Sequence, residues 1–104
     1  MKRVLIVDSD AELHDSFSHL LKSHGNHFKG EVAPSGEEAL RLIESRPFDL
    51  LITDLALPRM SGRELLAYAQ QKHPELKLIA MRDPRKGVNG FDAASLGVAA
   101  LLEK

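Results

Sequence analysis

The sequence predicts an α/β fold built on a doubly wound, five-stranded parallel sheet. Short apolar runs of strand length alternate along the chain with amphipathic segments of helix length. Most of these apolar runs are continuous, which is typical of strands that are buried on both faces of a parallel sheet. Parallel neighbours need crossover connections, and right-handed crossovers place helices on both faces of the sheet.

Five segments have the composition of strands. One of them, Phe28–Val32, alternates apolar and polar residues, which predicts a half-exposed strand at an edge of the sheet. The other four contain continuous apolar runs and are the segments Val4–Val7, Asp49–Asp54, Leu78–Met81 and Val98–Leu102.

Helix starts are marked by three capping boxes, in which a serine is followed three residues later by a glutamate. The serine oxygen accepts a hydrogen bond from the backbone of the third helical residue, and the glutamate reaches back. The pairs are Ser9 with Glu12, Ser35 with Glu38, and Ser61 with Glu64. A fourth, short helix is expected over Asn89–Leu96.

Composition limits the classes of function. The 104 residues predict a single domain, 1–104, and the absence of cysteine excludes disulfides, thiolate nucleophiles and cysteine-zinc sites. A net charge of −1 without a basic cluster predicts no direct binding of nucleic acid. The longest apolar stretch, Leu96–Leu102, is too short to cross a membrane. We therefore expect a cytoplasmic domain with no membrane partner.

Charged residues end four different strands of the predicted sheet: Asp8, Asp54, Arg82 and Lys104. The carboxyl ends of parallel strands share one edge, which is where ligands bind in open α/β sheets. Two adjacent carboxylates repel each other and favour a cation, and an oxygen site with few carboxylates suits Mg²⁺. A carboxylate nucleophile, a hard metal ion and a lysine together predict an aspartyl-phosphate site.

Each of these residues also has an ordinary interpretation. Asp54 would then be a solvated acid at a strand end, Asp8 an acid that favours the start of a helix, and Lys104 a surface lysine. The sequence around Asp54 favours a function, because the buried strand is followed by a distinctive loop.

Three stretches carry a family resemblance: VLIVDSD at residues 4–10, LLITDLALPRMSG at residues 50–62, and LGVAALLEK at residues 96–104. The middle one is the most specific, since a buried strand and an aspartate are followed by Leu-Pro and Met-x-Gly. With them the chain resembles, over its whole length, the receiver domain of bacterial two-component response regulators. The resemblance implies a flavodoxin-like strand order, 2-1-3-4-5.

The resemblance implies a phospho-acceptor switch rather than an enzyme acting on a metabolite, with at most self-phosphotransfer and autodephosphorylation. Asp54 would accept a phosphoryl group from a phosphohistidine on a sensor histidine kinase or phosphotransfer protein. Asp8, Asp54 and the backbone carbonyl of Ala56 would bind Mg²⁺. Lys104 would contact the phosphoryl group.

Three positions depart from the family pattern. Ser9 stands where the family has a second acid that ligates the metal, which predicts weakened Mg²⁺ binding; Ser9 itself or Asp10 is the candidate further ligand. Arg82 replaces a switch hydroxyl, and Leu101 replaces a switch aromatic. The Arg82 guanidinium is expected to pair with unmodified Asp54, to bind phosphoryl oxygens, or to face solvent.

Two other functions stay open. A degenerate receiver would bind partners without phosphorylation, as the three departures suggest. The second alternative is a flavodoxin-like domain that binds a cofactor. The lack of a Ser/Thr/Gly-rich phosphate loop after the first strand argues against it. The family also continues after its lysine with a fifth helix that this sequence lacks. We therefore expect a truncated domain with an apolar patch on one sheet face. An effector domain or a second copy of the chain, in a homodimer, is the expected partner.

Overall fold

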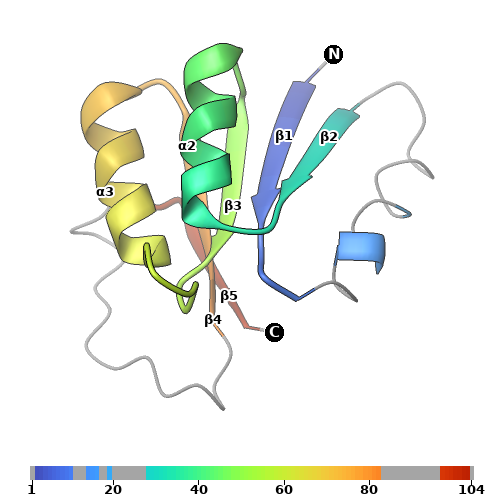
Figure 1. Ribbon diagram of the computed structural model, residues 1–104. Coiled ribbons are helices and arrows are strands. Elements are labelled where there is room, and N and C mark those ends of the chain that lie inside the picture. Colours follow the sequence, from blue (N-terminus) through green and yellow to red (C-terminus); the bar gives the residue numbers. More distant parts are fainter. Residues whose placement is uncertain (1, 11–13, 17–18, 20–27, 83–96, 104) are drawn as a thin grey trace.

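The computed structural model describes residues 2–10, 14–16, 19, 28–82 and 97–103. Five parallel strands form one sheet in the order β2-β1-β3-β4-β5 (Figure 1). The predicted α/β class and the order 2-1-3-4-5 are therefore confirmed. The strands are β1 (Lys2–Val7), β2 (Phe28–Ala33), β3 (Leu50–Asp54), β4 (Lys77–Arg82) and β5 (Ala100–Glu103).

Two helices are described in full, α2 (Gly36–Ser45) and α3 (Gly62–Lys72). Both begin at predicted capping serines: the Oγ atoms of Ser35 and Ser61 accept hydrogen bonds of 3.2 Å from the backbone three residues on. Residues 14–16 and 19 are helical, as expected, whereas Glu12 and the helix predicted over residues 89–96 lie outside the described residues. Neither described helix has the length and apolar character needed to traverse a membrane.

The main core lies between the sheet and helices α2 and α3, which lie side by side on one face (Figure 1). Alternation along β1 and β3 sends every second side chain into this layer. Its fully buried members include Leu5, Val7, Leu51, Leu65 and Leu66. Burial of each such side chain stabilises the fold by about 1.5–3 kcal/mol.

A smaller apolar cluster lies on the opposite face of the sheet. Val4, Ile6 and Met81 are its buried members. Leu102 pairs in register with Met81 and so shares this face, yet its side chain is 45% exposed. Phe28, at the start of β2, is 40% exposed. Among the described residues, this face therefore carries two partly exposed apolar side chains.

The two edge strands differ in how well the sequence predicted them. The half-exposed β2 does lie at an edge. For β5 the predicted start was wrong: the strand begins at Ala100 rather than Val98, and it continues to Glu103. Ala99 already donates a backbone hydrogen bond of 2.7 Å to Leu78, so the approach to the sheet begins before the regular ladder.

The loop between β3 and α3 packs against the end of β3 through a glycine. The Gly62 backbone N–H donates a 3.0 Å hydrogen bond to the carbonyl of Leu55. A Cβ atom at Gly62 would lie 2.0 Å from the carbonyl oxygen of Asp54 and 2.6 Å from the Cα of Leu55. Both neighbours are backbone atoms that cannot rotate away, so this position accepts no side chain.

Replacing Gly62 by alanine should lower the free energy of unfolding by about 2–3 kcal/mol, because the loop must move off the strand. Gly36→Ala is the comparison variant, since the atoms nearest to its Cβ would be side-chain atoms of Met60, at 3.1 Å, and not backbone atoms at 2.0–2.8 Å. Alanine also favours the helix by up to about 1 kcal/mol, so this control should change stability little. Urea unfolding of the two variants makes the comparison, and equal losses would contradict the proposed clash.

A carboxylate links α2 to the end of α3. Glu44 Oε1 accepts a 2.6 Å hydrogen bond from the Tyr68 hydroxyl and lies 3.0 Å from His73 Nε2. The hydrogen bond from Tyr68, followed by that from His73, lowers the pKa of the Glu44 carboxyl. The same bond raises the pKa of Tyr68.

In Tyr68→Phe the pKa of Glu44 should rise toward its ordinary value of 4.5, because the first cause of the shift is removed. A lowered folded-state pKa means that Glu44 adds stability above its unfolded pKa, and that this stability is lost as the pH falls through the folded pKa. The wild type should thus exceed Tyr68→Phe in stability at neutral pH, and the two should converge in acid. NMR titration of the Glu44 carboxyl tests this, and an unchanged pKa would refute it.

Candidate functional site

Two aspartates meet at the carboxyl edge of the sheet. Val7 of β1 pairs in register with Thr53 of β3, so the next residues, Asp8 and Asp54, lie beside each other. The Asp8 backbone N–H donates a 3.1 Å hydrogen bond to the Ala33 carbonyl, which extends the ladder one residue beyond β1. Both aspartates are 0% exposed. Two acidic side chains are therefore buried on adjacent strands.

Each carboxylate is fixed by a backbone N–H two residues further along the chain. Asp54 Oδ1 accepts a 3.0 Å hydrogen bond from Ala56, and Asp8 Oδ1 accepts one of 2.9 Å from Asp10. Such turns orient the side chain, and N–H groups stabilise its ionised form. Ser9 and Asp10 themselves are exposed, at the start of the loop.

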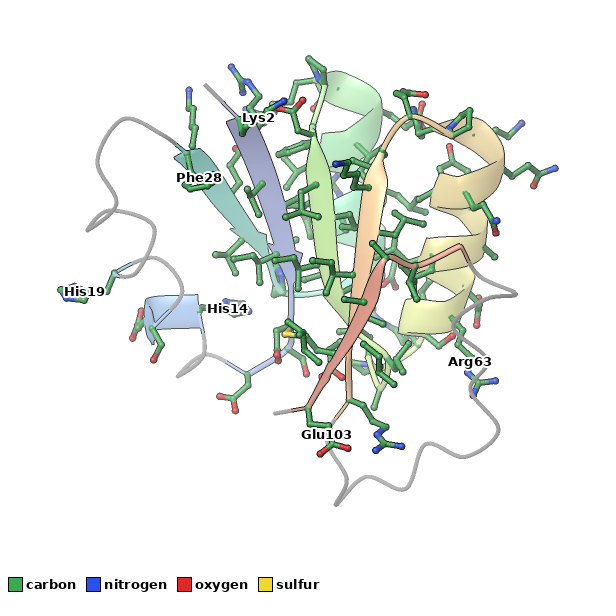
Figure 2. All side chains as sticks on the ribbon, turned by 180° about the vertical axis from the view of Figure 1, so that it is seen from behind. Lys2, His14, His19, Phe28, Arg63 and Glu103 are labelled. Atoms are coloured by element: carbon green, nitrogen blue, oxygen red, sulfur yellow. The ribbon has the colours of Figure 1, made fainter. Side chains whose placement is uncertain are left out.

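A histidine that the sequence analysis did not single out contacts this loop. Figure 2 labels His14 on the described helical residues that follow β1. Its Nε2 hydrogen-bonds to the backbone carbonyl of Asp8, and the ring nitrogen must donate because the carbonyl can only accept. The contact joins a helical residue to the end of β1. No local sequence pattern predicts this contact, since the spacing between Asp8 and His14 matches no helical or capping motif.

Arg82 ends β4 and forms an ion pair with the end of β5. Its Nη2 contacts Glu103 Oε1, and the two residues are register partners. The hypothesis that Arg82 pairs with unmodified Asp54 is therefore wrong for this structure. The physical reason is that β5 supplies a carboxylate directly opposite Arg82. Within the described part of the chain, the buried Nε of Arg82 has no hydrogen-bond partner.

Of the two remaining predicted site residues, the structure describes only Leu101. Leu101 lies in β5, paired with Ala80, and is 38% exposed. Lys104 lies outside the described residues.

The donor set at the carboxyl edge fits a hard cation. The carboxylates of Asp8 and Asp54 lie on adjacent strand ends, and Ala56 follows in the loop that Asp54 opens. Across residues 2–10, 14–16, 19, 28–82 and 97–103, no group of three or more His, Asp or Glu side chains could hold a metal ion. Mg²⁺ is usually bound by one or two protein carboxylates together with waters, and this pair supplies the carboxylates.

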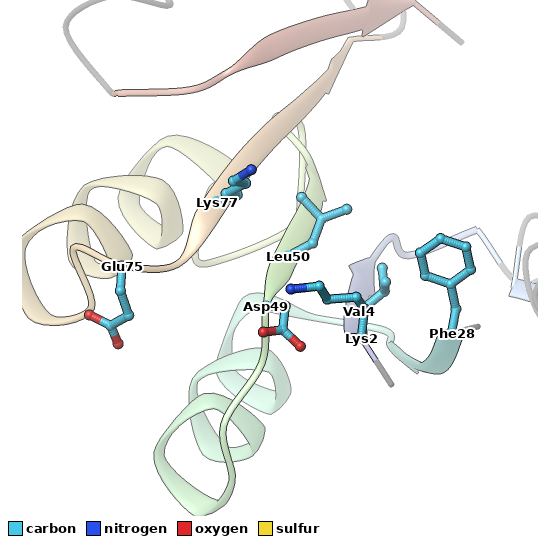
Figure 3. Close-up of a pocket in the computed structure, with 7 residues that line it drawn as sticks. All are labelled: Lys2, Val4, Phe28, Asp49, Leu50, Glu75 and Lys77. Atoms are coloured by element: carbon cyan, nitrogen blue, oxygen red, sulfur yellow. The ribbon is translucent and has the colours of Figure 1, made fainter. Parts of the chain in front are cut away.

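A hollow of about 290 Å³ lies at the other end of the sheet, where the strands begin (Figure 3). Its lining combines apolar side chains with charged side chains of both signs. It therefore lies apart from the paired aspartates. The lining residues are Lys2, Val4, Phe28, Asp49, Leu50, Glu75 and Lys77.

Comparison with known families identifies the family to which this fold and its paired aspartates belong. The model of the response regulator receiver domain matches residues 4–104, which is nearly the whole chain. The chain belongs to the response regulator receiver family. The predicted resemblance is thereby confirmed.

Individual receivers support the assignment. The response regulator receiver protein CpdR of Brucella abortus is 30% identical over 92% of this chain and 72% of its own length. The transcriptional regulatory protein CpxR of Escherichia coli is 37% identical over 88% of this chain but only 39% of its own. The chain spans 21% of FleR of Pseudomonas aeruginosa, at 32% identity over 98% of this chain. This receiver thus corresponds to a part of the longer relatives.

Solved receiver structures share the fold. A CheY-like receiver from Methanospirillum hungatei superimposes with a TM-score of 0.87 at 32% identity, covering 100% of this chain and 82% of that one. TrrA of Thermotoga maritima, solved in complex with Mg²⁺-BeF, gives a TM-score of 0.85 at 28% identity, covering 100% of this chain and 87% of that one.

Mg²⁺ should raise the melting temperature of this receiver, since a ligand that binds only the folded state stabilises it. At about ten times the dissociation constant the gain is about 1.4 kcal/mol, or several degrees for a domain of this size. Asp54→Asn should abolish most of that rise. Asp49→Asn should keep it, because Asp49 is exposed and its Oδ2 contacts Arg3 at the opposite edge. Thermal melts with and without MgCl₂ test this, and an Asp54→Asn rise equal to that of the wild type would exclude the site.

Proposed function

We propose that this receiver accepts a phosphoryl group on Asp54 from a phosphohistidine of a sensor histidine kinase or a phosphotransfer protein. The observation that carries the proposal is the pair of buried aspartates, Asp8 and Asp54, at the carboxyl edge of a receiver fold. Gly62 supports the site, because it lets the following loop close onto the backbone of Asp54.

In the transfer step, a carboxylate oxygen of Asp54 attacks the phosphorus of the phosphohistidine. An O–P bond forms, the P–N bond breaks, and its electron pair returns to the imidazole nitrogen. The product is an acyl phosphate on Asp54 and a histidine restored on the partner. The Ala56 N–H, 3.0 Å from Asp54 Oδ1, orients the attacking carboxylate.

Mg²⁺ would be held by Asp8, Asp54 and the carbonyl of Ala56, with Ser9 or Asp10 as the further ligand. The ion would neutralise the negative charge that gathers as a phosphoryl group approaches two carboxylates. A serine offers a neutral oxygen in place of an acid, so we propose weaker metal binding than a site with a further acid would have. Lys104 is assigned to the phosphoryl oxygens.

The output we propose is a change of contacts rather than turnover of a metabolite, beyond self-phosphotransfer and autodephosphorylation. A switch of this kind works in the cytoplasm, where the kinase presents its phosphohistidine. An effector domain or a second copy of the chain would receive the signal. The support is that CpxR, a transcriptional regulator, is much longer than its matching receiver segment.

Incubation with acetyl phosphate and Mg²⁺, followed by intact-mass measurement, tests the function. We expect one phosphoryl adduct on the wild type and on the control Asp49→Asn, and none on Asp54→Asn. Addition of EDTA before the donor should suppress the adduct. An unmodified wild type would overturn the proposal and favour a phosphorylation-independent interaction module; an adduct that persists in Asp54→Asn would place the acceptor elsewhere.

A further inference from the structure

We propose that Glu103 is a positioning residue that holds the Arg82 guanidinium, and that a phosphoryl group on Asp54 draws this guanidinium away from Glu103. The inference rests on the proposed function, because it concerns the phosphorylated form of the same site. In this proposal the Glu103 carboxylate and the phosphoryl group compete for the guanidinium of Arg82.

The first support is the position of Arg82. Asp54 and Met81 are register partners, and the Met81 carbonyl accepts a 3.0 Å hydrogen bond from Leu55, directly after Asp54. Neighbouring strands lie about 4.8 Å apart with a rise of about 3.3 Å per residue, so the Cα atoms of Arg82 and Asp54 are roughly 6 Å apart. Arg82 is the last residue of β4, whereas β3 ends on Asp54 and β5 ends on Glu103.

The second support is the unused hydrogen-bonding capacity of the guanidinium. Nη2 contacts Glu103, whereas the buried Nε finds no partner among the described residues. A guanidinium presents five N–H donors in a planar fork. A phosphoryl group carries a charge of about −1.5 to −2 and three acceptor oxygens, so it can engage the fork at two points. A single carboxylate contact is the weaker competitor.

The third support is that the existing pair can open at low cost. The Arg82 and Glu103 side chains are 35% and 59% exposed, and exposed ion pairs contribute little net stability. Figure 2 shows Glu103 at the end of β5, with its carboxylate directed away from the strands. Alternation along β4 places Arg82 on the sheet face opposite to Met81 and Asp54, so the guanidinium must swing over the end of the sheet to reach a phosphoryl group.

The probe is beryllofluoride with Mg²⁺, which mimics a phosphoryl group on a carboxylate and whose affinity can be measured by titration. Arg82→Gln should weaken its binding by about tenfold, as expected for the loss of a charge-assisted pair. Glu103→Gln should tighten binding about two- to fivefold, because the guanidinium is released. Glu103→Ala should act in the same direction, and Glu75→Gln, exposed at the opposite edge, should have no effect.

The deciding measurement is Glu103→Gln in the Arg82→Gln background. The competition predicts that the gain disappears there, since no guanidinium remains to release. An equal gain in both backgrounds would show a through-space charge effect and overturn the inference, as would an Arg82→Gln affinity equal to the wild type. These results leave phosphorylation of Asp54 intact, whereas a wild type that takes neither acetyl phosphate nor beryllofluoride would reject the proposed function and this inference together.

Discussion

The parallel register of β1 and β3 determines the chemistry of this molecule. Because Val7 lies opposite Thr53, the residues that follow them, Asp8 and Asp54, become buried neighbours although they are distant in the chain. Burial makes their charges costly unless hydrogen bonds and a cation offset them. The backbone N–H groups of Ala56 and Asp10 supply part of that compensation. The fold therefore concentrates negative charge at one edge, which is the condition for binding a divalent ion.

The sequence predicted those features of the fold that local patterns encode. Continuous apolar runs located the strands, and the capping serines Ser35 and Ser61 located the starts of α2 and α3 within one residue. The adjacency of Asp8 and Asp54 followed from a general property of parallel sheets, that all strands end at one edge.

Contacts between separate elements could not be predicted in the same way. The Arg82–Glu103 pair depends on the register of β4 with β5, which no short motif specifies. The bond from His14 to the Asp8 carbonyl depends on how a helix sits at the end of β1. The start of β5 was misplaced because Val98 and Ala99 are as apolar as the strand itself, so composition gives no boundary there.

Two departures from the family pattern change the charge of the site in the same direction. Ser9 removes a negative charge at the end of β1, and Arg82 adds a positive charge at the end of β4. In the structure the second change is offset locally, because Glu103 pairs with Arg82. The positive charge available to a phosphoryl group on Asp54 therefore depends on the Arg82–Glu103 contact. This contact joins β4 and β5, which carry none of the proposed metal ligands.

The link between Glu44 and Tyr68 also has a practical consequence. The chain contains one tyrosine and no tryptophan, so Tyr68 is its sole strong ultraviolet fluorophore. Its hydroxyl donates a hydrogen bond to a carboxylate on the neighbouring helix. Its emission therefore reports the approach of α2 to α3 without any attached dye.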